Sequence, residues 1–310
     1  MLAIVLALAS AVAYGGSDFA AGLASRGASV IRVTLLASVA SALVGGAALP
    51  FAAAHPPSAG SLAWGAAAGL GGTTGALALY FGFRHAAFSV AGPLSAVGAA
   101  GLSVLAGLLL GERPSGLALA GIILALPAIV GVSASAAASG RAGRGEEADL
   151  GERSGQGERA EQADHGEGHG RPFAGVAAGL VAGACFALLF IGLNRAGSHS
   201  GLWPVVAAQV AELTAAIVAA AVTRNVRLPA ARQGRLAVLT GAAGAAGTIA
   251  YFFATHEGFL AVTAVLTSLY PAVTIVLART LLGERLTALR LTGLGLAAVC
   301  VALIAAGGAG

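Results

Sequence analysis

The amino-acid sequence predicts an all-α integral membrane protein whose ten transmembrane helices form two inverted five-helix repeats. The composition and an internal repeat carry this prediction. Of the 310 residues, 57% are hydrophobic and 10% are charged, whereas a soluble domain carries about 25% charged residues. Mean hydropathy is +0.87, and the long apolar segments lack the polar faces that a soluble helical solenoid would need.

The internal repeat becomes visible when the chain is compared with itself at an offset of 172 residues, without a gap. Residues 109–113, Leu-Leu-Gly-Glu-Arg, then match residues 281–285, and Gly69, Gly72 and Gly75 match Gly241, Gly244 and Gly247. We therefore expect a first repeat at 1–138, a linker at 139–172 and a second repeat at 173–310. Five spans are an odd number, so the second repeat must insert upside down. Inverted repeats are typical of secondary transporters.

Each repeat contains five segments of the length that a membrane-spanning helix needs, about 20 apolar residues. Residues that interrupt helices separate them: Pro57 and Pro229 cannot continue a helix, and Gly111 and Gly283 stand where a C-terminal cap is expected. The expected spans are 2–24, 30–50, 61–83, 87–110 and 115–138 in the first repeat, and 173–195, 202–222, 236–256, 258–282 and 287–308 in the second.

The linker between the repeats has a different composition, with eight acidic residues, five arginines and many glycines but no apolar periodicity. Such a segment cannot bury a core, and we expect it to be disordered. Of the 17 arginines, 15 fall on the linker side of the membrane and only Arg113 and Arg195 on the other. The positive-inside rule then predicts a multi-pass protein of the cell membrane with a cytoplasmic linker and both termini outside.

Several other functions find no support in the sequence. Cys185 and Cys300 lie within apolar segments and are interpreted as small core residues. His165 and His169 lie in the linker, where no helix is expected to bring them together as metal ligands. There is no basic stripe with interleaved aromatic residues, as a nucleic-acid-binding protein would have. We expect no metal, no cofactor and no nucleic-acid partner.

Motifs at the hairpins resemble those of a known family. Residues 108–113 and 280–285, each ending in Leu-Leu-Gly-Glu-Arg, and the run Ser268-Leu-Tyr-Pro-Ala-Val look like the sequences that close each half of EamA-type transporters in the drug/metabolite transporter superfamily. Residues 14–17, Tyr-Gly-Gly-Ser, resemble the turn in the first helix of that family. The resemblance covers both repeats and implies a ten-helix inverted-repeat fold that exports or exchanges small metabolites. Two features depart from the family: Ala99 stands where the second repeat has Pro271, and many relatives keep both termini in the cytoplasm.

Asp18 and Glu212 are acidic residues within expected spans, where an ionisable side chain costs at least about 2.5 to 3.5 kcal/mol and usually faces the bundle interior. Asp18 shares a helix face with Tyr14. We interpret it as a proton or cation site, as a structural partner of Arg32 or of backbone donors, or as a solvated residue near the interface. Glu212 follows Gln209 by one turn, which predicts a polar cavity beside both or an interhelical hydrogen bond. At the repeat offset, their partners are Phe190 for Asp18, Ala37 for Gln209 and Ala40 for Glu212.

For the remaining candidate residues, we weigh a role in the site against a structural role. Arg32 is either a partner for Asp18 or an interfacial arginine that snorkels. Tyr251 and Tyr270 are candidates to face the cavity. Pro93 and Pro271 are expected to break the fourth and ninth spans, where transporters place their sites, or else only to kink them. The hairpin motifs are interpreted as structural, with each glutamate near a helix N-terminus: Gly111, Glu112, Arg113, Gly283, Glu284 and Arg285.

These patterns favour a secondary transporter of a small metabolite, such as an amino acid or drug-like compound. It would act as an exporter or exchanger in the lipid bilayer, and protons are a candidate coupling ion. Two alternatives are a membrane-embedded enzyme and a non-transporting sensor or assembly subunit. The motifs of an intramembrane protease are absent from the sequence, so we do not expect an enzyme.

Overall fold

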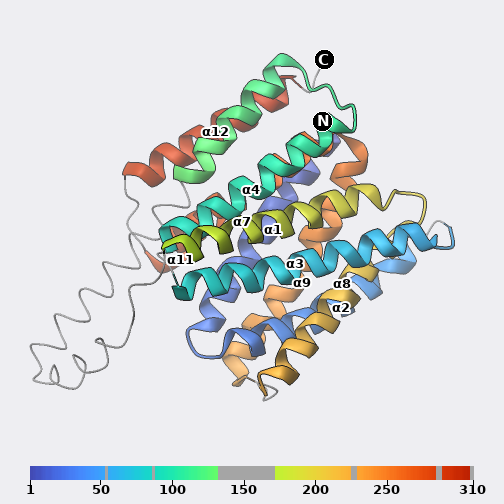
Figure 1. Ribbon diagram of the computed structural model, residues 1–310, viewed down its shortest axis with the longest axis vertical. Coiled ribbons are helices and arrows are strands. Elements are labelled where there is room, and N and C mark those ends of the chain that lie inside the picture. The colour runs from blue at the N-terminus through green and yellow to red at the C-terminus, as the bar shows by residue number, and fades with distance from the viewer. Residues whose placement is uncertain (53–54, 86–87, 132–171, 225–228, 284–287, 308–310) are drawn as a thin grey trace, which may run out of the picture.

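The computed structural model describes residues 1–52, 55–85, 88–131, 172–224, 229–283 and 288–307, and these form helices joined by short turns (Figure 1). The linker therefore lies outside the described residues, except for Pro172. The helices of the first repeat are α1 (Leu2–Ser25), α2 (Val30–Ala52), α3 (Ala59–His85), α4 (Phe88–Leu109) and a fifth helix at Gly116–Gly131. Those of the second are α7 (Pro172–Arg195), α8 (Trp203–Val222), α9 (Ala231–Glu257), α10 (Leu260–Thr267), α11 (Tyr270–Leu282) and α12 (Ala288–Gly307).

The helices have the length and composition of membrane spans. Six described segments are long and apolar enough to cross a bilayer, and one of them, Leu260–Leu282, consists of α10 and α11 together. Three shorter apolar helices add to these, at Leu94–Leu109, Gly116–Gly131 and Leu291–Gly307. Many large apolar side chains, such as Leu43 and Val218, are exposed on the outside of the bundle, as expected where lipid is the solvent. The prediction of an all-α membrane protein of about ten helices is confirmed.

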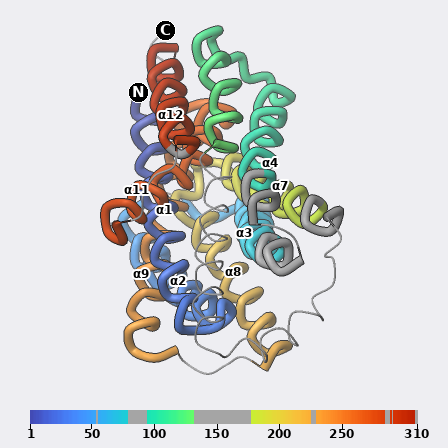
Figure 2. The backbone as a smooth tube through the Cα atoms, turned by 90° about the vertical axis from the view of Figure 1, so that its left-hand side faces the viewer, coloured from blue at the N-terminus to red at the C-terminus, as the bar shows by residue number. Residues whose placement is uncertain are grey.

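The helices pack mainly across the boundary between the repeats. Helix α1 lies along α9, and α3 lies along α7; α9 also contacts α2, and α3 also contacts α8. At the repeat offset α1 corresponds to α7, α2 to α8 and α3 to α9, so these contacts form related pairs, as two inverted repeats would produce. The fifth helices, Gly116–Gly131 and α12, pack against each other at one edge of the bundle (Figures 1 and 2).

Close helix contacts at two glycines show that the alignment of the two repeats must be shifted by one residue in α2 and α8. A Cβ atom on Gly69 would overlap the backbone of Ala208, and one on Gly241 would overlap the backbone of Ala37. Gly69 and Gly241 are 172 positions apart, but Ala37 and Ala208 are only 171 apart. The gap-free alignment is therefore wrong by one residue in α2 and α8. The structural counterparts of Gln209 and Glu212 are Ser38 and Ser41, and not the alanines that the sequence alignment indicated.

The expected helix terminators act as predicted at both glycines. Gly111 and Gly283 have φ angles of 91° and 69°, in the left-handed region where glycine is favoured. Each donates its N–H to the end of the preceding helix, at 3.0 Å to Leu108 and 3.1 Å to Arg279. The following motif residues Glu284 and Arg285 lie outside the described residues.

The two prolines behave differently. The ninth span breaks at Ser268–Leu269, between α10 and α11, and Pro271 is the second residue of α11. Proline fits this position because the first N–H groups of a helix have no partner within it. Helix α4, in contrast, continues from Phe88 to Leu109 through Pro93, so the expected break there is wrong. Pro93 removes one backbone hydrogen bond near the helix start, and the remaining bonds maintain the helix.

Candidate functional site: a cavity between the two repeats

A cavity of about 250 Å³ lies in the middle of the bundle, between the first four spans of each repeat. Every one of those spans contributes to its lining, and several lining residues correspond to one another at the repeat offset, such as Tyr14 with Phe186 and Gly72 with Gly244. The cavity therefore lies where the axis relating two inverted repeats would pass. This position, near the middle of the spans, is where repeat-built transporters bind their substrates.

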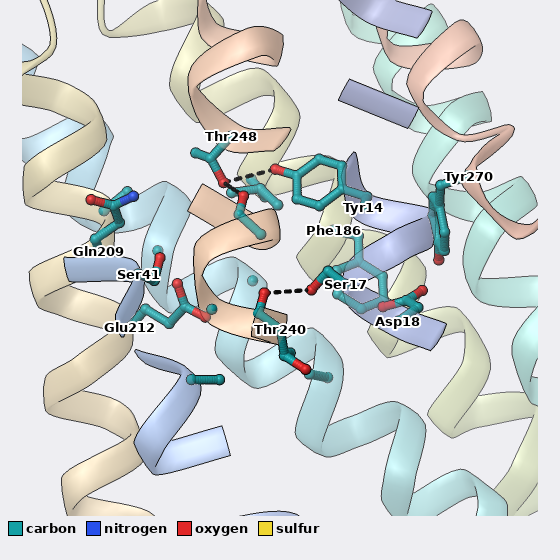
Figure 3. A pocket seen from close by; sticks show the side chains of 18 of the residues that line it. Tyr14, Ser17, Asp18, Ser41, Phe186, Gln209, Glu212, Thr240, Thr248 and Tyr270 are labelled. Atoms are coloured by element: carbon teal, nitrogen blue, oxygen red, sulfur yellow. Dashed lines mark hydrogen bonds between the residues drawn. The ribbon is translucent and has the colours of Figure 1, made fainter. Parts of the chain in front are cut away.

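One wall of the cavity is polar and comes from α1, α9 and the break between α10 and α11. The Tyr14 hydroxyl forms a 2.9 Å hydrogen bond with the Thr248 hydroxyl, and Ser17 donates to the backbone oxygen of Thr240 at 2.9 Å (Figure 3). Thr274 of α11 donates to the backbone oxygen of Gly15 at 3.1 Å. These bonds hold α1 between α9 and α11, so they orient the face of α1 that lines the cavity.

The opposite wall is apolar and comes from α3, α4 and α7. Its larger side chains are Phe186, Leu189 and Phe190, and the remaining lining residues of these helices are glycine and alanine. Phe190 occupies the position that corresponds to Asp18, and Leu189 the position that corresponds to Ser17. The two repeats thus supply similar backbone frames but opposite chemistry, which makes the cavity polar on one side and apolar on the other.

Two carboxylates line the cavity from different helices. Asp18 is on α1 and is exposed, whereas Glu212 on α8 is half-buried. Figure 3 shows Glu212 near Ser41 and Gln209 on one side, and Asp18 near Ser17, Phe186 and Tyr270 on the other. Among the described lining residues there is no arginine, lysine or histidine. Both ionisable acid–base side chains that could carry a full charge near neutral pH in the described lining are therefore carboxylic acids.

Gln209 is the most unusual polar residue of the cavity. Its side chain is 1% exposed, and neither the amide oxygen nor the amide nitrogen has a hydrogen-bond partner among the described residues. The amide packs against Gly45 of α2, where a Cβ atom would overlap it. Burying an unpartnered amide costs about 1 to 3 kcal/mol. Gly45 therefore provides the space for a polar group whose partner is not a described residue.

The cavity is closed at the end of the bundle that holds both chain termini, here called the terminus side. Beyond the cavity, Asn194 of α7 donates to the backbone and the hydroxyl oxygen of Thr255 of α9, at 3.2 and 3.0 Å. The Tyr251 hydroxyl donates to the backbone oxygen of Phe190 at 3.3 Å, and both side chains are buried. These contacts join α7 to α9 and separate the cavity from the terminus side.

Glu112 adds a third contact on the terminus side. Its carboxylate accepts hydrogen bonds from the backbone N–H groups of Leu260 and Ala261, at 2.5 and 2.9 Å. Glu112 therefore caps the N-terminus of α10, as expected for a carboxylate beside the positive end of a helix dipole. The helix that it caps belongs to the other repeat, so this hairpin residue connects the two repeats.

The other end of the bundle is here called the linker side. Asp18 lies in the linker-side half of α1, and it both lines the cavity and is exposed. One turn further along, a Cβ atom on Gly22 would meet no atom within 4 Å. Asp18 and Gly22 thus leave this part of α1 exposed.

The structure brings five of the seven residues predicted for the pathway to the cavity: Tyr14, Asp18, Gln209, Glu212 and Tyr270. The other two are placed elsewhere. Tyr251 is 0% exposed and packs with Phe190, with ring centroids 4.6 Å apart, so it contributes to the core behind the cavity wall. Arg32 lies in the first turn of α2 and does not line the cavity. Arg113 is exposed at the hairpin.

Sequence reasoning missed the hydroxyl-bearing residues of the cavity. Ser17, Ser41, Thr240, Thr248 and Ser268 all line it. Serine and threonine are common in membrane helices because they can bond to their own backbone, as Thr248 does to Gly244 at 3.0 Å. One signal was available: Ser17 lies one turn after Tyr14 and next to Asp18, within the motif that suggested the family.

Comparisons with known proteins agree with this geometry. The apolar helices define a multi-pass membrane protein. The model of the EamA-like transporter family matches residues 1–134, which confirms the family resemblance of the motifs over the first repeat. That family implies a membrane transporter of the drug/metabolite transporter type.

Solved structures support the fold over the whole chain. Twelve chains match, and one of them, described as "Crystal structure of protein", has a TM-score of 0.62 and 17% sequence identity. The match covers 97% of this chain and 95% of that one. At this identity the likeness shows the fold alone. Comparison with curated proteins found no match.

Proposed function

We propose that this protein is a secondary transporter that moves a small metabolite through the central cavity, as an exporter or exchanger in the cell membrane. The observation that carries the proposal is the position of two carboxylates, Asp18 and Glu212, in a mid-span cavity between the repeats. Carboxylates at this depth are costly and usually serve a substrate or ion pathway.

Protons are the coupling ion that the cavity favours. A carboxylate can lose a proton to one side and regain it from the other when access alternates. Asp18 and Glu212 are the candidates for this exchange. The linker, placed in the cytoplasm by the arginine distribution, would then lie on the side from which the cavity is accessible. An exporter would load its substrate from that side.

Flux through reconstituted protein tests the proposal. Proteoliposomes would be loaded with a small-molecule extract of the expression host, and the compounds released into the medium would be identified by mass spectrometry. We expect selective release of one class of metabolite, absent from protein-free liposomes. A membrane-embedded enzyme would alter compounds without moving them, and a sensor or assembly subunit would do neither.

A pair of matched variants links the flux to the cavity. Gly72 lines the cavity, and a Cβ atom there would have only ordinary contacts with Leu189, at 3.8 Å or more. Gly72→Leu should fold and fill the cavity, whereas Gly101→Leu places the same side chain in open space on α4. Loss of flux is expected only in Gly72→Leu. Equal flux in both variants would show that this cavity is not the pathway.

A further inference from the structure

The chemistry of the cavity restricts the substrate more narrowly than the fold does. Asp18 and Glu212 are the charged side chains among the described lining residues. An anionic substrate would meet two acidic side chains in this cavity and no described cation to offset its charge. A cationic group would instead receive charge-assisted hydrogen bonds, which are about twice as strong as neutral ones.

Aromatic side chains accompany one of the carboxylates. Figure 3 shows Phe186 and Tyr270 near Asp18, from α7 and the start of α11. Aromatic faces attract cations, with a contribution of about 0.5 to 2 kcal/mol that rises as water is excluded. A carboxylate beside aromatic rings is therefore suited to an ammonium group, and less suited to a neutral sugar or a strongly hydrated inorganic ion.

The apolar wall indicates what the rest of the substrate is like. Phe186, Leu189 and Phe190 line the cavity from α7, and Figure 3 shows Phe186 at the end of this wall that is near Asp18. An apolar group on the substrate would be desolvated there, at about 25 cal/mol per Å² of buried apolar surface. A fully polar cation such as a small polyamine would leave this wall without a partner.

Unpartnered buried polar atoms provide a second, independent sign of a ligand. The Gln209 amide and the Ser268 hydroxyl are each 1% exposed, line the cavity, and have no hydrogen-bond partner among the described residues. Such groups normally have partners in native structures. The Ser268 hydroxyl can donate or accept a hydrogen bond. The Gln209 amide lies against Gly45 of α2 and would have to turn toward the cavity to do the same.

We propose that the substrate is a small organic cation, an amine with one compact apolar or aromatic group, bound with its nitrogen on the carboxylate side and its apolar group against Phe186, Leu189 and Phe190. This inference rests on the proposed transport function. The volume of about 250 Å³ lies just below the range of about 300 to 1,000 Å³ for drug-sized ligands, which favours a single-ring compound.

Three probes with the same ring and carbon spacing separate the charge classes. Phenethylamine is a cation, phenylalanine adds a carboxylate to the same frame, and phenylacetate is an anion. Binding of each to the purified full-length protein would be measured by isothermal titration calorimetry. We expect phenethylamine to bind at least about tenfold more tightly than the other two. Phenylacetate lacks the ammonium group, and phenylalanine brings a carboxylate close to Asp18 and Glu212. Phenylalanine or phenylacetate binding as tightly as phenethylamine would overturn the proposal.

Variants of the carboxylates test the binding mode. Asp18→Asn and Glu212→Gln preserve shape but remove charge, and at least one should weaken phenethylamine binding about tenfold or more. Glu257→Gln is the matched control, because Glu257 is exposed at the end of α9 and does not line the cavity. Phenethylamine affinity that stays unchanged in both cavity variants, with both proteins folded, would also overturn the proposal.

A transport measurement distinguishes this inference from the proposed function. The probe is the N,N,N-trimethyl derivative of phenethylamine, whose permanent charge prevents passive crossing, and protein-free liposomes are the control. Uptake of this probe supports both proposals. Tight phenethylamine binding without any flux of the probe or of extract metabolites supports the substrate class but overturns the transport function. Flux of anionic metabolites from the extract, with no uptake of the probe, overturns the substrate class but preserves transport.

Discussion

The side-chain amide of Asn194 donates to both the backbone oxygen and the hydroxyl of Thr255, residues on α7 and α9 that are 61 positions apart. This contact lies between the cavity and the terminus side of the bundle. Together with the bond from Tyr251 to the Phe190 backbone, it joins the two helices on the side where the cavity is closed. We therefore interpret the contact as part of the closure that must separate when access alternates.

Removing this contact should destabilise the closed state. Asn194→Leu keeps the size of the side chain but loses both hydrogen bonds to Thr255. We expect a loss of about 1 to 2 kcal/mol in unfolding free energy, measured by thermal unfolding in detergent. Thr214→Val is the control, because Thr214 is exposed and bonds only within its own helix. A similar loss in both variants would contradict the special role of Asn194.

Glu112 should stabilise the protein through a helix in the other repeat. Glu112→Ala removes both acceptors from the N-terminus of α10 and should cost about 0.5 to 2 kcal/mol. Glu112→Gln retains one acceptor oxygen without the charge, so its loss of stability should be smaller than that of Glu112→Ala. Arg113→Ala, in the adjacent exposed residue, should have little effect. Thermal unfolding would measure all three, and equal effects of Glu112→Ala and Arg113→Ala would contradict the capping role.

The glycines at the repeat contacts should not tolerate even a methyl group. A Cβ atom at Gly69 or Gly241 would overlap the backbone of a neighbouring helix, and forced overpacking costs about 1 to 3 kcal/mol. We expect Gly69→Ala and Gly241→Ala to lower the unfolding temperature and the yield of folded protein.

Gly46→Ala is the matched control, because a Cβ atom there meets no atom within 4 Å. Alanine is a better helix former than glycine, so this variant should be neutral or slightly more stable. If Gly69→Ala and Gly241→Ala were as stable as Gly46→Ala, the close helix contacts would be wrong.

The arginine distribution predicts the orientation in the membrane. A reporter fused after Gly310 should be extracytoplasmic, because 15 of 17 arginines fall on the linker side. Alkaline phosphatase and green fluorescent protein fusions at this position would measure it. Fluorescence without phosphatase activity would place the C-terminus in the cytoplasm and reverse the assigned orientation, without changing the fold.

Much of the fold was predictable because its determinants are local or periodic. Apolar segments of bilayer length predicted the spans, and Gly111 and Gly283 predicted helix ends because a left-handed residue favours glycine. The one-residue shift in α2 and α8 was not predictable, because the rest of the chain matches itself at an offset of 172 residues. Only the contacts of Ala37 and Ala208 reveal the different offset of these two helices. The continuation of α4 through Pro93 depends on how many hydrogen bonds remain around it, which a sequence does not show.

The candidate site was predictable to the extent that charge is costly in a membrane. Asp18, Glu212 and Gln209 stand out in apolar helices, and all three line the cavity. Tyr251 was equally conspicuous, yet it bonds to the Phe190 backbone behind the wall. A tyrosine side chain is stable both at a polar cavity and in the core behind its wall, so the residue type alone does not decide between these two positions. The partner of Glu112 on α10 was also hidden, because 148 residues separate it from Leu260.

The central claim is that the cavity carboxylates couple substrate movement to protons. The most direct test compares metabolite efflux from extract-loaded proteoliposomes with and without an imposed pH gradient, for the unmodified protein, Asp18→Asn, Glu212→Gln and the control Glu257→Gln. We expect at least one cavity variant, with Glu212→Gln favoured because Gln209 adjoins it, to fold but to lose the dependence of efflux on the gradient. Glu257→Gln should behave like the unmodified protein. Normal efflux with normal dependence on the pH gradient in both cavity variants would contradict the claim and make the carboxylates structural.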